Sequence, residues 1–88
     1  MGKLSVLLPI YNGMTAYPTG RMVNSISSVL RLECEKEVIV IDDGSIDVTA
    51  HYLQHYFGDG ITLIKNGANR GQAVSLNKGL EAATGDYI

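Results

Sequence analysis

The sequence predicts an α/β protein in which helices cover both faces of a parallel sheet. Short apolar runs alternate with segments of helical periodicity, in the order β-α-β-α-β-α-β. The first two runs are almost free of polar residues, which is typical of strands buried on both faces of a parallel sheet. Right-handed crossovers that reverse direction at the first strand then give a three-layer, Rossmann-like arrangement with strand order 3-2-1-4.

Four apolar runs mark the expected strands. Residues 3–9 and 37–42 are the strongest, residues 61–65 form a weaker run, and a fourth begins at residues 86–88, where the sequence ends. A fourth strand truncated at this point leaves one edge of the first strand open. Because unpaired edges invite pairing with another chain, we expect self-association through that edge.

Three amphipathic segments lie between the runs, the first over about residues 20–32. We expect Ser45 to cap the second helix and Asn69 to cap the third, with Gly85 ending the third helix. Each segment places apolar side chains on one helical face. The three predicted stripes are Met22, Ile26, Val29 and Leu30; Val48, Tyr52, Leu53 and Tyr56; and Ala73, Leu76, Leu80 and Ala83.

Composition excludes several classes of protein. The chain has 88 residues, of which 45% are hydrophobic and 18% charged, so it is expected to fold as one small domain and not to be disordered. A net charge of -2 without a basic stripe argues against a nucleic-acid partner. The single cysteine, Cys34, excludes an internal disulfide and indicates a reduced thiol in a cytoplasmic protein. No apolar run approaches the ~20 residues of a membrane span, so we expect a soluble chain.

Polar, glycine-rich segments follow the first three strands, at residues 9–13, 42–45 and 65–69. Ligands of such sheets bind at the carboxyl ends of the strands. Neither the phosphate-loop motif nor the dinucleotide-binding glycine motif is present. Asp42 and Asp43 are instead expected to face Tyr11 and Asn12, where a carboxylate accepts a uracil N3–H or ribose hydroxyls and a ring stacks on the base. An equally open alternative is that both aspartates only cap the next helix and brace the turn.

The two histidines, His51 and His55, lie four residues apart on the second predicted helix. Tyr52 stands where the zinc-binding motif H-E-x-x-H has its glutamate. We therefore interpret both histidines as solvated or packing residues, and we predict no metal ligand and no catalytic residue in this chain.

Four motifs in order resemble family 2 glycosyltransferases over essentially the whole chain. They lie in residues 5–13, 25–30, 37–45 and 69–88. Two departures stand out: residues 14–20 look like an insertion, and Val48 replaces a usual glycine. The resemblance implies the glycosyltransferase-A fold, a nucleotide-sugar donor that is usually UDP-linked, and inverting transfer to an acceptor hydroxyl.

The resemblance also implies roles for single residues. Pro9, Ile10 and Tyr11 match the positions that wall the nucleoside base, and Asn12 belongs to the same motif. Asp43 matches the aspartate that hydrogen-bonds the uracil, while its neighbour Asp42 supports the turn. The residues that match the segment lining the nucleotide cleft are Arg70, Gly71 and Asn77. For Arg70 and Asn77, a surface charge and simple helix packing stay open as alternatives.

The family's metal-binding D-x-D motif is expected a few residues past Ile88, and the general base further on. We therefore expect residues 1–88 to be the nucleotide-sugar-binding, N-terminal part of a glycosyltransferase domain, inactive by itself. The full-length enzyme would use Mn²⁺ or Mg²⁺ and a saccharide or lipid-linked acceptor, in the cytoplasm or at a membrane surface. A non-catalytic nucleotide-binding or assembly module is the alternative, and a structural domain without a ligand is a third reading.

Overall fold

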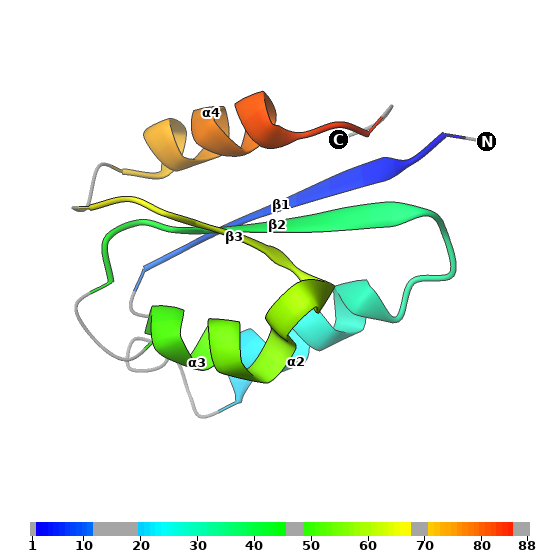
Figure 1. The fold of residues 1–88 in the computed structure, drawn as a ribbon, viewed down its shortest axis with the longest axis horizontal. Helices are drawn as coiled ribbons and strands as arrows, with labels where there is room; N and C mark the ends of the chain where they lie inside the picture. Colours follow the sequence, from blue (N-terminus) through cyan, green and yellow to red (C-terminus); the bar gives the residue numbers. More distant parts are fainter. Residues whose placement is uncertain (1, 12–19, 46–48, 68–70, 86–88) are drawn as a thin grey trace.

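The structure, a computed structural model, describes residues 2–11, 20–45, 49–67 and 71–85. Its centre is a parallel sheet of β1 (Leu4–Ile10), β2 (Lys36–Asp42) and β3 (Thr62–Lys65), in the order β1-β2-β3. Helices cover both faces of this sheet (Figure 1). The α/β class is therefore confirmed, whereas the strand order 3-2-1-4 stays a prediction. Residues 86–88 lie outside the described residues, so the place of a fourth strand stays a prediction.

The helices form the two outer layers (Figure 1). One face of the sheet carries α2 (Arg21–Leu30) and α3 (Thr49–Phe57), which continues into a 3-10 turn, η1 (Gly58–Gly60). Of the helices in the described residues, α4 (Gln72–Ala82) covers the other face. None of the helices formed by the described residues has the length and apolar character that a membrane span requires.

The central strand β2 is the most deeply buried element. Val38, Ile39, Val40 and Ile41 are all buried, because helices cover both faces of this strand. Continuous burial does not extend to β1, where only Ser5 is fully buried. Within the described residues β1 pairs with β2 alone, so its position at the edge explains the difference.

The main apolar core lies between the sheet and the pair α2 and α3. The stripe of α2 is confirmed: Met22 and Ile26 are buried, with Val29 and Leu30 packed against the same cluster. In α3 the prediction is only partly right, since Leu53 is buried whereas Tyr56 is 58% exposed. The buried members of this core are Met22, Ile26, Val38, Val40, Leu53 and Ile61.

The stripe predicted for α4 is wrong. The buried residues of this helix are Ser75 and Gly79, whereas Leu80 is 48% exposed. A Cβ at Gly79 would lie only 2.9 Å from Ile41 Cδ1 and 3.2 Å from Leu7 Cδ2. The helix therefore lies so close to the sheet that small residues fill the contact.

Both ends of α4 also differ from the prediction. The N-cap is Gly71, two residues after the predicted Asn69, and the helix gives way to extended backbone at Ala83. Gly85 thus does not end the helix. A Cβ at Gly85 would lie 2.7 Å from the Lys3 carbonyl oxygen and 2.9 Å from the Ser5 nitrogen. Glycine is needed there because the chain passes directly against the backbone of β1.

A cluster of hydrogen bonds holds the segment after α4 against the start of β1 and β2. Ser5 Oγ donates to Glu37 Oε2 at 2.5 Å and accepts from the Gly85 nitrogen at 2.9 Å. The backbone nitrogen and the hydroxyl of Thr84 donate to the same Glu37 oxygen, at 2.6 and 3.0 Å. The Ser5 hydrogen bond, followed by that of the Thr84 backbone, lowers the pKa of Glu37 from 4.5 to about 2. We call Ser5, Glu37, Thr84 and Gly85 the Glu37 clamp.

We expect Gly85→Ala to lower the free energy of unfolding by about 1–3 kcal/mol, because the added methyl group meets two backbone atoms that cannot move aside. Gly60→Ala is the matched control, since no atom lies within 4 Å of a Cβ there. Urea unfolding of both variants measures the effect. Equal unfolding midpoints for Gly85→Ala and Gly60→Ala would contradict the close approach.

The Glu37 clamp makes the free energy of unfolding depend on pH. Because the folded-state pKa of Glu37 is depressed, its contribution to stability is present above about pH 4.5 and is lost as the pH falls through about 2. Between about pH 6 and pH 2.5, the parent chain should therefore lose more unfolding free energy than Glu37→Gln does. Glu35→Gln, at an exposed position, should behave like the parent. Identical pH profiles for the parent and Glu37→Gln would refute the clamp.

Candidate functional site

Hydrogen bonds hold the carboxyl ends of the three strands side by side. The Asp43 nitrogen donates to the Ile10 carbonyl at 2.8 Å, and the Asn66 nitrogen donates to the Asp42 carbonyl at 2.8 Å. The ladder pattern thus continues one residue beyond the strands. Asp43 is thus joined to Ile10, the residue that precedes Tyr11, at this edge of the sheet.

Asp43 is 5% exposed, and both of its carboxylate oxygens accept hydrogen bonds. Oδ1 accepts from Asn66 Nδ2 at 2.8 Å, and Oδ2 accepts from the Gly71 backbone nitrogen at 2.8 Å. The carboxylate therefore joins the end of β2 to the residue after β3 and to the start of α4. A negative charge is favourable there because the first turn of a helix presents free N–H groups and a partial positive charge.

Gly71 adopts a backbone conformation, φ 94° and ψ 161°, that is essentially restricted to glycine. This conformation turns its N–H toward Asp43 at the entry to α4. The predicted site residues Asp43 and Gly71 are thus in direct contact.

Asn66 is a site residue that the sequence analysis missed. Its side chain is 4% exposed and donates to Ser75 Oγ at 3.1 Å as well as to Asp43. Its Oδ1 is buried and has no hydrogen-bond partner among the described residues. The available signal was its position, because Asn66 follows β3 directly, as Asp43 follows β2.

Asp42 is buried and serves the turn that follows β2. Its Oδ1 accepts hydrogen bonds from the backbone nitrogen of Ser45, at 3.2 Å, and from the Ser45 hydroxyl. Gly44 between them has φ 74°, a conformation that glycine adopts without strain. The residues of this turn thus support one another.

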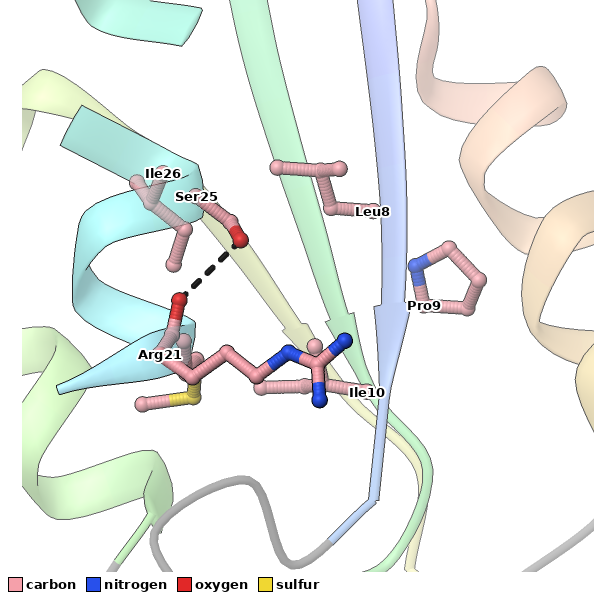
Figure 2. Close-up of a pocket in the computed structure, with 7 residues that line it drawn as sticks. Leu8, Pro9, Ile10, Arg21, Ser25 and Ile26 are labelled. Carbon is pink, nitrogen blue, oxygen red and sulfur yellow. Dashed lines mark hydrogen bonds between the residues drawn. The ribbon is translucent and has the colours of Figure 1, made fainter. Parts of the chain in front are cut away.

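Pro9 and Ile10 lie beside a separate, mostly apolar pocket between β1 and α2, of about 250 Å³. Figure 2 shows Leu8 and Ile10 pointing from β1 toward α2, while the Pro9 ring points to the other face of the sheet. Neither Asp42 nor Asp43 lines this pocket. The residues that line it are Leu8, Pro9, Ile10, Arg21, Met22, Ser25 and Ile26.

The remaining predicted residues are spread more widely. Tyr11 is 38% exposed and directly follows β1. Asn77 is exposed on α4, and no hydrogen bond links it to Asp43 within the part of the chain that the structure describes. Asn12 and Arg70 lie outside the described residues.

The described residues do not form a metal site. No group of three or more His, Cys, Asp or Glu side chains lies close enough together among residues 2–11, 20–45, 49–67 and 71–85. His51 and His55 are both exposed on α3, with their rings stacked 6.2 Å apart, in agreement with the solvated role inferred for them.

Comparison with known proteins gives one consistent family. A family model described as "Glycosyl transferase family 2" matches residues 5–88. EpsE of Bacillus subtilis (strain 168), classed by its name among the glycosyltransferases, is 39% identical over 98% of this chain and 31% of its own length. The poly-beta-1,6-N-acetyl-D-glucosamine synthase of Staphylococcus epidermidis is 36% identical over 97% of this chain and 20% of its own length.

A solved structure shares the fold. The mannosyltransferase PcManGT from Pyrobaculum calidifontis, in complex with GDP-Man and Mn²⁺, superimposes with a TM-score of 0.74 at 23% identity. The match covers 97% of this chain and 25% of that one. The chain thus spans between a fifth and a third of the length of these relatives.

The turn after β2 can be tested through Asp42. Asp42→Ala should lower the free energy of unfolding by about 1–3 kcal/mol, because the backbone N–H and the hydroxyl of Ser45 lose their acceptor. Asp42→Asn keeps an acceptor oxygen and should lose clearly less. Thermal unfolding of both variants decides the matter, and equal losses would show that the hydrogen bonds to Ser45 do not stabilise the turn.

Proposed function

The chain belongs to glycosyl transferase family 2, and on this premise we propose that it binds the donor nucleotide of an inverting glycosyltransferase. The proposed donor is a UDP-linked sugar, transferred to an acceptor hydroxyl. Residues 1–88 would supply the nucleotide-sugar-binding, N-terminal part of the enzyme.

One observation supports the proposal: the hydrogen bond between the Asp43 nitrogen and the Ile10 carbonyl, which joins Asp43 to the residue that precedes Tyr11. Tyr11 is 38% exposed, and an aromatic ring is a flat surface on which a base can stack. The Asp43 carboxylate offers acceptor lone pairs to a base N–H, and a hydrogen bond to a charged acceptor is among the stronger ones. A uracil has such a donor at N3.

The other predicted residues have supporting parts in this proposal. Ile10 points toward α2 and Pro9 toward the other face of the sheet, and the family resemblance assigns both to the wall of the base. Gly71 gives its N–H to Asp43, so we assign it the task of holding that carboxylate. Asn12, Arg70 and Asn77 are assigned to the nucleotide cleft by the family resemblance, and Asp42 to the turn.

The described residues do not fit a metal ion, so no step of this proposal passes through a metal held by them. PcManGT is described with Mn²⁺ and GDP-Man, which supports a divalent ion and a nucleotide-sugar donor for the longer enzyme. Its guanine nucleotide makes the choice of base, uracil or guanine, the part of the proposal that most needs testing.

The acceptor and the location are inferred from the relatives. The Staphylococcus synthase is named for a polysaccharide, and a Proteus mirabilis relative, 34% identical, is named for undecaprenyl phosphate. We therefore propose a saccharide or lipid-linked acceptor and a cytoplasmic protein that works at a membrane surface. Self-association through β1 belongs to the same proposal, because within the described residues that strand pairs on one side only.

Calorimetric titration with UDP tests the site. Asp43→Ala should weaken UDP binding by about 1–3 kcal/mol, or roughly 5- to 150-fold, because one charge-assisted hydrogen bond is lost. Asp59→Ala, at an exposed position in η1, is the matched control and should bind like the parent. GDP and inorganic diphosphate complete the series. Equal binding of UDP and diphosphate, or no effect of Asp43→Ala, would overturn the proposal.

A further inference from the structure

We propose that Asn66 is a positioning residue that fixes the orientation of the Asp43 carboxylate for the donor nucleotide. This inference rests on the proposed function and adds a residue outside the family motifs identified in the sequence. It is carried by a chain of buried hydrogen bonds at the carboxyl edge of the sheet, which runs from Ser75 through Asn66 to Asp43.

The amide of Asn66 is anchored at both ends. Its backbone nitrogen donates to the Asp42 carbonyl at 2.8 Å, which fixes the Cα relative to β2. Its Nδ2 donates to Asp43 Oδ1 at 2.8 Å and to Ser75 Oγ at 3.1 Å. All three side chains are at least 95% buried, so packing leaves the amide little room to rotate.

Two of the donors that hold the carboxylate come from different parts of the chain. The Gly71 backbone holds Oδ2 and the Asn66 side chain holds Oδ1, both at 2.8 Å. The last torsion of an aspartate side chain has a broad, shallow energy profile, so one hydrogen bond does not fix the plane of the carboxylate. Two hydrogen bonds on opposite oxygens do fix it. Asn66 therefore helps to fix the plane of the Asp43 carboxylate.

The unused oxygen of Asn66 points to the same conclusion. Oδ1 is buried without a hydrogen-bond partner among the described residues, and a buried polar atom in that state costs stability. A side chain selected for packing alone would carry no such atom. What this position uses is the donor end of the amide, and that end faces Asp43 and Ser75.

A double-mutant cycle on UDP affinity tests the inference. Asn66→Ala should weaken UDP binding about tenfold in the parent background and less than about twofold in the Asp43→Ala background, because Asn66 acts through Asp43. Ser75→Ala removes the other partner of Asn66 and keeps the bond to Asp43, so it should weaken UDP binding less than Asn66→Ala does. Asp59→Ala, at an exposed position in η1, is the control and should bind like the parent. An equal loss from Asn66→Ala in both backgrounds would show a general effect on folding and overturn the proposal.

Two further measurements keep the test decisive. If Asn66→Ala does not fold, Asn66→Leu fills the space without a donor and takes its place in the cycle. In the chain without nucleotide, NMR exchange rates of the two Asn66 side-chain amide protons should show both protected, with Asp43→Ala releasing one. If the parent does not bind UDP, the proposed function fails, and these rates still decide the Asn66–Asp43 bond: unchanged protection in Asp43→Ala would refute it.

Discussion

The buried carboxylate of Asp43 organises the carboxyl edge of the sheet. The backbone of Asp43 continues the pairing of β2 with β1. Its two carboxylate oxygens accept hydrogen bonds from Asn66 and Gly71. A charge removed from water is tolerated only when it is paired or hydrogen-bonded, so these donors are a condition for placing an acid there. The position of α4 and the ends of two strands all depend on this arrangement.

Elements with a sustained pattern of apolar residues were predictable from the sequence. The first three strands and α2 were located to within about two residues, because burial of a regular apolar face dominates their energetics. For α4 the same reasoning failed. There the close approach of Gly79 to Leu7 and Ile41 decides which face is buried, and small residues carry almost no hydrophobic signal.

The site divides in a similar way. Asp43 and Gly71 stood out because each belongs to a motif whose residues are close in sequence. Asn66 did not, because its significance comes from a side-chain contact with a residue 23 positions away. That Pro9 and Ile10 line an apolar pocket apart from Asp43 was equally out of reach, since it depends on how β1 lies against α2.

The close packing at Gly79 fixes the distance of α4 from the sheet. Gly71 lies eight residues earlier, about 12 Å along the helix axis at 1.5 Å per residue. A helix transmits displacement along its length as a nearly rigid rod, so the height at which Gly79 rests on Ile41 also sets the height of Gly71 beside Asp43. Any bulk inserted under the middle of α4 would tilt the rod and change the length of that hydrogen bond. The packing of α4 on the sheet at Gly79 thus affects the hydrogen bond between Gly71 and Asp43, two helical turns away.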